Sequence, residues 1–246
     1  MIRAELRHVT EGASFPVLLA VAAVLNVLAV LGTSQGMELG SATSDAQAEA
    51  AFESLVGLGF GASLFSMIHG ALVVTRDFQS CSIWRASILH RGPDVLLRRR
   101  LVALSVPAVA FAAVGVLAAG VPAYLAVSQT GYNPGLTDHL RTALPGVAAT
   151  IVLSAWFGHL VGWLLRRSIA AIVLLVAWTL FVETSVLGLS DTVGRYLPGP
   201  ALQAAMADPT ATADLLGVGA GYLVYAGWLV ALGALAVLTL RRRDLV

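Results

Sequence analysis

Six long windows without a charged side chain divide the sequence, and no other feature constrains the fold as strongly. The windows lie between Glu11 and Glu38, Glu53 and Arg76, Arg100 and Asp138, Arg141 and Arg166, Arg167 and Glu183, and Asp214 and Arg241. A helix of roughly 20 apolar residues crosses the hydrocarbon core of a bilayer. The windows therefore predict six transmembrane helices, at residues 14–32, 55–74, 101–127, 143–165, 169–189 and 215–240.

The composition agrees with that of an integral membrane protein. Hydrophobic residues make up 58% of the sequence and charged residues 12%, whereas an average soluble domain is about a quarter charged. The single cysteine, Cys81, excludes an intrachain disulfide framework and a four-thiolate metal site. We expect an all-α integral membrane protein that forms one transmembrane domain over residues 1–246. In the third window, Gly120 and Pro122 are expected to bend or end the helix near the far interface.

The arginines predict the orientation, because cytoplasmic loops retain positive charge. The side assigned to the cytoplasm holds Arg3, Arg7, Arg76, Arg85, Arg91, Arg98, Arg99, Arg100, Arg166, Arg167, Arg241, Arg242 and Arg243. The opposite side holds Arg141 and Arg195. Both termini are therefore predicted to be cytoplasmic. The first apolar segment lacks a small-x-small cleavage site, so we interpret it as a retained helix and not as a signal peptide.

Residues 1–12, "MIRAELRHVTEG", have an amphipathic pattern. Ile2, Leu6 and Val9 fall on one helical stripe. The other faces carry Arg3, Arg7 and Glu11. The pattern predicts a helix that lies along the cytoplasmic interface, and a frayed topogenic tail is the alternative.

Two outer segments have the composition of short helices. The Ala-rich half of "TSQGMELGSATSDAQAEAAFES" suits a helix capped at Ser44. The acidic residues of this segment are compatible with an ordinary solvated loop or with attraction of cationic substrates. In a later segment, Pro198 and Pro200 precede "ALQAAMA". That pattern is typical of a short helix at or dipping into the outer interface, with a simple loop as the alternative.

The loop at residues 75–100 carries six arginines between two apolar segments. Wound at 100° per residue, one face of a helix from Phe78 to Arg91 holds Phe78, Cys81, Trp84, Ile88 and Leu89. The other face holds Gln79, Ser80, Ser87, His90 and Arg91, while Ile83 and Arg85 break the pattern. Gly92 and Pro93 then suit the start of the next helix. So long a patterned loop favours a docking element for a cytoplasmic partner over a topological anchor alone.

The run "TRDFQSCSIWRASILHRGPDVLLRRRLVAL" resembles the segment between the second and third helices of ABC-2 type ABC transporter permeases. There, a Thr-Arg-Glu-aromatic-Arg-x-Gly-Thr-Ile run precedes a proline or basic turn and a helix that opens on Leu-x-x-Lys-Leu. The positions that match in kind are Thr75, Arg76, Asp77, Phe78, Ser82, Ile83, Gly92, Pro93 and Arg100. Cys81 stands in place of the usual glycine, Gln79 of an arginine and Arg100 of a lysine. The six-helix plan and the "YLPGPALQAA" segment are also similar.

The resemblance implies a plasma (inner) membrane permease subunit of an ABC exporter, whose 75–100 loop forms a coupling helix that rests on a separate ATPase. The residues expected to contact or latch that ATPase are Asp77, Phe78, Trp84, Arg85 and Ile88, with Arg76 and Arg100 as candidate partners of Asp77. Replacing Trp84 or Asp77 by Ala is expected to uncouple transport while membrane insertion stays intact.

The partners follow from the same resemblance. The chain has no lysine and so no P-loop; we expect no cofactor on this chain, and ATP and Mg in two copies of the ATPase. Six helices are half of the usual permease, which implies a second permease subunit, identical or homologous. The arginines lie at membrane ends and do not suggest nucleic-acid binding.

Polar residues inside the spans are candidates for the translocation path, because desolvating them costs several kcal/mol unless they find partners or water. They are Asn26, His69, His159 and Glu183. For Glu183, substrate contact or gating, a structural hydrogen bond and an outer-interface position all stay open. We expect structural hydrogen bonds or interface placement for both histidines and an interhelical hydrogen bond for Asn26. Gly217 and Gly221 are candidate helix-packing residues.

Other functions fit the sequence less well. An intramembrane hydrolase would pair Ser66 or Ser154 with His69 or His159, but no Gly-x-Ser-x-Gly setting surrounds either serine. A metalloenzyme lacks its His-Glu-x-x-His run. A secondary transporter would be expected to have more spans and charges near the midplane, and a non-transporting scaffold or sensor would use the loop for another partner. The exporter resemblance implies a small amphipathic molecule, peptide or lipid as cargo, and the sequence does not distinguish among them.

Overall fold

The computed structural model describes residues 2–36, 45–90, 92–129, 131–135, 138–206 and 215–242. Within these residues every regular element is helical, and no strand occurs. The elements are α1 (Ile2–Thr10), α2 (Ser14–Gly36), α3 (Asp45–Gly57), the 3₁₀ turn η2 (Leu58–Gly61), α4 (Ala62–Gln79), α5 (Ile83–Leu89), α6 (Pro93–Ser128), α7 (Asp138–Leu165), α8 (Ser168–Ala177), the π-helical turn η3 (Trp178–Val182), α9 (Glu183–Leu189), α10 (Asp191–Gly194), α11 (Pro198–Ala205) and α12 (Val218–Arg242).

Among the described residues, six helical segments are long and apolar enough to cross a membrane, which confirms the predicted number. They are Ser14–Gly36, Asp45–Gln79, Pro93–Ser128, Ala143–Leu165, Ser168–Leu189 and Val218–Leu240. Large apolar side chains on α2, α6, α8 and α12 are exposed on the isolated chain, as expected of surfaces that face lipid. The chain has the architecture of a multi-pass membrane protein.

The third span continues where the sequence suggested a bend or an end. α6 runs through Gly120 and Pro122 to Ser128. Proline removes one backbone donor from a helix, but the turn that follows is held by packing: Ala119, Ala123 and Val127 are buried against Leu55 of α3 and its neighbours. The prediction that these residues end the helix was wrong because tertiary packing outweighs one missing hydrogen bond.

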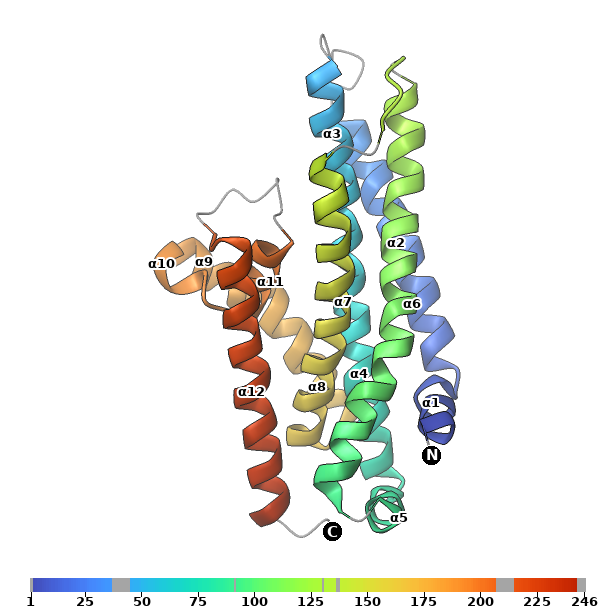
Figure 1. The fold of residues 1–246 in the computed structure, drawn as a ribbon, viewed down its shortest axis with the longest axis vertical. Helices are drawn as coiled ribbons and strands as arrows, with labels where there is room; N and C mark the ends of the chain where they lie inside the picture. Colours follow the sequence, from blue (N-terminus) through green and yellow to red (C-terminus); the bar gives the residue numbers. More distant parts are fainter. Residues whose placement is uncertain are drawn as a thin grey trace.

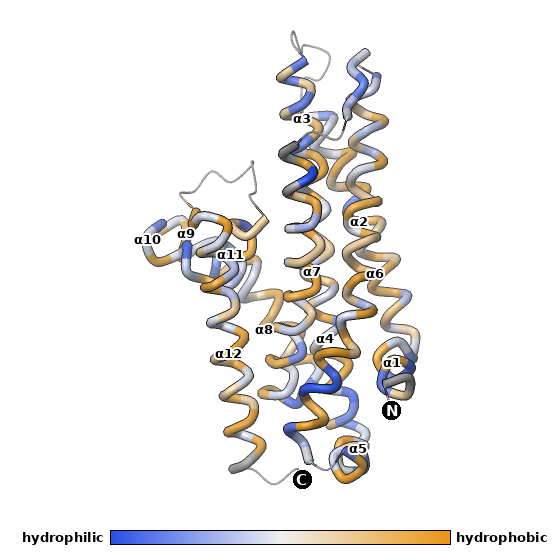
Figure 2. Tube along the Cα trace, viewed as in Figure 1, coloured by the Kyte–Doolittle hydropathy of each residue, from blue (hydrophilic) through white to orange (hydrophobic). Residues whose placement is uncertain are grey.

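The helices form a long bundle with a shorter group beside it (Figure 1). α2, α4, α6 and α7 run side by side, and α3 extends the bundle at its far end. α8 and α12 stand beside this bundle, with α9, α10 and α11 packed near the upper end of α12. α1 and α5 lie at the opposite end, together with the C-terminal end of α12. The tube coloured by hydropathy shows hydrophilic residues gathered at that end of α4 and α6 (Figure 2).

We call this end the arginine-rich end. It carries Arg7, Arg76, Arg85, Arg98, Arg99, Arg100, Arg166 and Arg167.

Close packing of α4 against α7 forms the centre of the bundle. A side chain on Gly158 would collide with the backbone of Met67, and one on Gly70 with the backbone of Ala155. The Ser66 hydroxyl donates to the Ile151 carbonyl across the same contact, at 3.0 Å. Small residues let the two backbones approach this closely.

The predicted packing glycines, Gly217 and Gly221, do not lie in the contact between α4 and α7. Gly221 abuts α11, where a Cβ would meet the Ala201 carbonyl oxygen at 2.6 Å, whereas a Cβ on Gly217 would find open space among the described residues. The Gly158 and Gly162 pair on α7 carries the small-x-x-x-small spacing that the sequence reading overlooked.

The short helices proposed outside the spans are present. α3 contains the Ala-rich segment and continues through η2 into α4, while Ser44, its expected cap, lies outside the described residues. α11 forms at the proline-rich segment, and Ala201, Leu202 and Ala205 are buried beneath neighbouring helices. This helix therefore packs into the protein.

The amphipathic N-terminal segment folds as α1 and docks on the bundle. Val9 is fully buried among Val73, Leu104 and Ala108, with Leu6 packed beside it. The apolar stripe of α1 thus faces protein, and a frayed tail is not what this segment forms. The side chain of Ile2 lies outside the described part.

Candidate functional site

The 75–100 segment forms a helix, a sharp turn and a short second helix at the arginine-rich end. α4 continues through Phe78 to Gln79, and the turn at residues 80–82 leads into α5. Cys81 has a φ of 54°, a left-handed conformation that glycine adopts most easily. This is the position where the permease pattern has its glycine.

α5 has one side buried against the protein and one side exposed. Ile83 is 1% exposed, and Ser87 and His90 are also buried. Ile88 and Leu89, by contrast, are 74% and 69% exposed. Because the turn at residues 80–82 separates Phe78 from α5, a wheel drawn continuously from Phe78 has the wrong phase. Of the residues predicted to share one face, Cys81, Ile88 and Leu89 are exposed, whereas the Phe78 ring packs in the bundle, so the prediction was wrong for Phe78.

Phe78 belongs to the bundle. Its ring meets Trp163 edge-on, with ring centroids 5.3 Å apart, and the Arg166 guanidinium lies over it at 5.1 Å. This side chain fixes the end of α4 against the end of α7. Arg85 is exposed on α5, and the Trp84 side chain lies outside what the structure describes.

Asp77 is the centre of a buried ionic cluster. Arg100 Nη1 contacts Asp77 Oδ2, and both side chains are almost fully buried. His8 Nε2 of α1 lies 3.0 Å from the same oxygen, and the Ser82 hydroxyl donates to Asp77 Oδ1 at 3.0 Å. Of the two proposed partners of Asp77, Arg100 is the one in contact. Arg76 is exposed, and no ion pair joins it to Asp77 among the residues described.

Glu5 extends this cluster to the end of α5. Glu5 Oε1 lies 3.0 Å from His90 Nε2, and Glu5 Oε2 lies 3.4 Å from Arg100 Nε. His90 Nδ1 is 2.8 Å from the Ala86 carbonyl oxygen. Both ring nitrogens of His90 thus face oxygen atoms. We refer to Glu5, His8, Asp77, His90 and Arg100 as the ionic cluster.

The ionic cluster fixes the loop to the bundle by joining α1, the end of α4, the end of α5 and α6. Removing one partner of a buried ion pair leaves an uncompensated charge, which costs about 3–5 kcal/mol. Asp77→Ala is therefore expected to destabilise the chain and is a poor test of coupling alone. No group of three or more His, Cys, Asp or Glu side chains suited to a metal ion occurs in the part of the chain that the structure describes.

His159 has a structural hydrogen-bonding role. Trp163 Nε1 donates to His159 Nε2 at 3.0 Å, so the ring proton lies on Nδ1, which is 3.1 Å from the Gly70 carbonyl oxygen. The ring joins α7 to α4 at their closest approach. This agrees with the expected structural role.

Asn26 departs from the expected interhelical hydrogen bond, whereas for His69 the expected interface placement stays a prediction. The His69 ring packs between Phe15 and Phe111, with centroids 5.3 and 5.7 Å away, and neither ring nitrogen has a hydrogen-bond partner among the described residues. Asn26 Nδ2 donates to the Ala22 carbonyl of its own helix at 2.7 Å, not to another helix.

Glu183 is buried, with 5% of its surface exposed, and follows directly on the π-helical turn η3. Its Oε1 accepts hydrogen bonds from Trp178 Nε1 at 2.9 Å and from the Gly199 amide at 3.0 Å. π-helical turns inside helices occur frequently at functional sites. The three roles left open from sequence all stay predictions, and the structure adds that Glu183 borders a cavity lined by residues of several helices.

The serines considered for hydrolysis donate to backbone carbonyls. Ser66 bonds to Ile151, and Ser154 bonds to Thr150 at 2.8 Å. Neither serine forms a hydrogen bond with His69 or His159 in the described structure.

No family model matches the chain, and no curated protein matches it. The class that the fold defines is a helical multi-pass membrane protein.

Proposed function

We propose that the chain is the membrane-spanning permease subunit of an ATP-driven ABC exporter and that α5 is its contact with a separate ATPase. The observation that carries the proposal is the two-sidedness of α5. One side is fixed to the bundle by Ile83 and His90, and the other presents Ile88 and Leu89 to the surroundings. Adjacent exposed apolar side chains at a polar end of the molecule are typical of a protein contact.

The inner side of α5 gives the contact a mechanical consequence. Ile83 packs in a cluster that includes Leu96 of α6, Trp163 of α7 and Leu240 of α12. The ionic cluster joins the adjoining turn to α1 and α6. Closely packed interiors transmit displacement because they have few voids to absorb it. A displacement of Ile88 and Leu89 is therefore transmitted to several transmembrane helices at once.

The remaining assignments follow from this role. The arginine-rich end faces the cytoplasm, as the positive-inside rule requires, so both termini are cytoplasmic and the chain resides in the plasma (inner) membrane. ATP and Mg bind to two copies of the ATPase, and a second permease subunit completes the transporter. Arg76, Arg85 and Trp84 stay predictions as contact residues of the ATPase.

Co-purification tests the proposal. The tagged chain is isolated from its own membranes in mild detergent, and co-eluting proteins are identified by mass spectrometry. We expect a stoichiometric soluble ATPase with the unmodified chain and its loss with the pair Ile88→Asp and Leu89→Asp, since both side chains are exposed and their change leaves the bundle intact.

Arg7→Asp is the matched control, because Arg7 is an exposed side chain at the same end of the molecule. It should retain the ATPase. An unmodified chain that elutes alone, under conditions that preserve other membrane complexes, would contradict the permease assignment. Retention of the ATPase by the α5 double variant would contradict the assigned contact.

A further inference from the structure

A cavity of about 190 Å³ lies beside Glu183, between the main bundle and the shorter group of helices. Its wall is built from α4, α7, α9, α11 and α12 together with η2 and η3. Five helical segments far apart in the sequence thus meet around one carboxylate. Polar side chains in the wall are Ser63, Thr179, Glu183, Thr184 and Gln203.

The position of the Glu183 carboxylate is fixed by the start of α11. Pro198 and Pro200 have no backbone N–H, and the Ala201 amide bonds to the Leu197 carbonyl at 2.9 Å. Gly199 therefore supplies the free amide of this first turn, and it donates to Glu183 Oε1. A Cβ on Gly199 would collide with the same carboxylate. Because residue 199 has no side chain, the Glu183 carboxylate can lie against the first turn of α11.

The carboxylate has donors but no counter-ion. Trp178 and Gly199 satisfy Oε1, yet no Arg or His forms an ion pair with Glu183 among the described residues. Removing an unpaired charge from water is expensive, so a buried carboxyl group is either protonated or, when charged, paired with a positive group. A positive group that enters the cavity would supply the missing partner.

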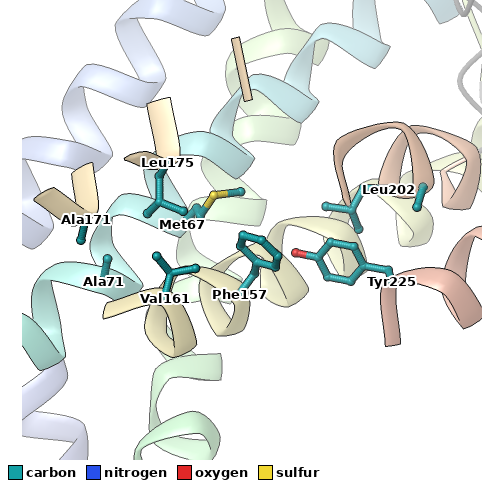
Figure 3. Close-up of a cluster of buried hydrophobic side chains, with 9 residues drawn as sticks. Met67, Ala71, Phe157, Val161, Ala171, Leu175, Leu202 and Tyr225 are labelled. Atoms are coloured by element: carbon teal, nitrogen blue, oxygen red, sulfur yellow. The ribbon is translucent and has the colours of Figure 1, made fainter. Parts of the chain in front are cut away.

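Aromatic rings form much of the remaining wall. Phe60, Phe157, Trp178 and Tyr225 all border the cavity. Phe157 and Tyr225 lie next to each other in the buried cluster, with ring centroids 5.9 Å apart, and Figure 3 shows the Tyr225 hydroxyl directed toward Phe157. Aromatic faces attract organic ammonium groups and do so more strongly where water is excluded.

We propose that this cavity binds a small organic cation, an ammonium group carrying an apolar substituent, with Glu183 as its counter-ion and the aromatic wall around its alkyl or aryl part. An anion would be repelled by Glu183, and a neutral apolar molecule would leave that carboxylate unpaired. The statement that the cation is transported rests on the proposed function. The statement that it binds to the chain does not.

Binding is measured directly on the purified full chain in phosphatidylcholine nanodiscs, with radiolabelled benzyltrimethylammonium as the probe. Neopentylbenzene, its uncharged carbon isostere, is the competitor. We expect saturable binding that the isostere does not displace at equal concentration. In Glu183→Gln the amide oxygen still accepts from Trp178 and Gly199, and we expect affinity to fall at least about tenfold.

Asp191→Asn is the control, because Asp191 is an exposed carboxylate close in sequence; its affinity should be unchanged. Leu64→Trp fills the cavity while it keeps Glu183, and it should also abolish binding, so the test holds even if Glu183→Gln fails to fold. Equal affinity in Glu183→Gln and Asp191→Asn, or equal displacement by neopentylbenzene, would overturn the proposal. Intact binding in a chain that shows no ATPase partner would contradict the permease role alone.

Discussion

Cys81 is the residue at which the loop departs both from the permease pattern and from ordinary backbone geometry. Its φ of 54° lies in the left-handed region, where a residue with a side chain is less stable than glycine by roughly 1–2 kcal/mol. The thiol side chain is exposed, so it contributes little packing in return. The turn between α4 and α5 thus keeps its conformation although Cys81 raises its conformational free energy.

Cys81→Gly is expected to stabilise the chain by about 0.5–1 kcal/mol, after allowance for the greater freedom of glycine in the unfolded chain. The free energy of unfolding in mixed micelles measures this. Arg166 has a similar φ of 57°, but its guanidinium stacks on Phe78, so Arg166→Gly should not stabilise. A loss of stability in Cys81→Gly would show that the thiol has a contact role.

The ionic cluster shows how far residue patterns could predict the site. Arg76 and Arg100 were both candidate partners of Asp77, and Arg100 is the one in contact. Glu5 and His90 were missed. Glu5 lies three residues after Ile2 and four before Val9, hence on the apolar stripe of α1, and a carboxylate on a buried stripe signals a partner. Which partner it meets depends on how α1 docks, and that is tertiary information.

At the scale of elements, α5 shows why the face of a short helix is hard to predict. Its sequence offers apolar side chains all around: Ile83 on one side and Ile88 with Leu89 on the other. The left-handed turn at Cys81 changes the direction of the chain, so the periodicity of α4 gives no phase for α5. The helix itself was predictable, but the side that faces the bundle was not.

The α4 and α7 contact is the element pair most sensitive to added volume. Gly158→Ala would place a methyl group into the Met67 backbone, and overpacking typically costs about 1–3 kcal/mol, occasionally more. We expect a loss of at least this size in the free energy of unfolding. Gly233→Ala is the control, since a Cβ there meets open space and alanine favours a helix. Equal stability of the two variants would refute this packing.

At the scale of the whole molecule, the six spans could be predicted because charge is excluded from a bilayer and the windows without charge are long. The short helices α9, α10 and α11 lie beneath the far end of the main bundle (Figure 1). Their enclosure of Glu183 could not be read from the sequence. It depends on the Pro198 and Pro200 turn meeting a carboxylate from another element, which no local pattern encodes.

The proposed ATPase contact on α5 lies at one end of the molecule, and the cavity beside Glu183 is lined by the same helices that pack near that contact. Met67 and Phe157 border the cavity, and they stand on α4 and α7, two helices that also contact each other through Phe78 and Trp163. A load on α5 would reach the cavity through this pair. This transmission requires that a soluble ATPase contacts α5 at Ile88.

Site-specific cross-linking in native membranes tests this claim most directly. Cys81 is the only cysteine in the chain, so Cys81→Gly provides a background in which Ile88→Cys carries the single thiol and a photoactivatable reagent. If α5 contacts the ATPase, we expect a cross-link from residue 88 to a soluble ATPase. We expect none when the thiol is placed instead by Arg7→Cys on α1. Equal labelling from both positions, or a cross-link from residue 88 to lipid alone, would contradict it.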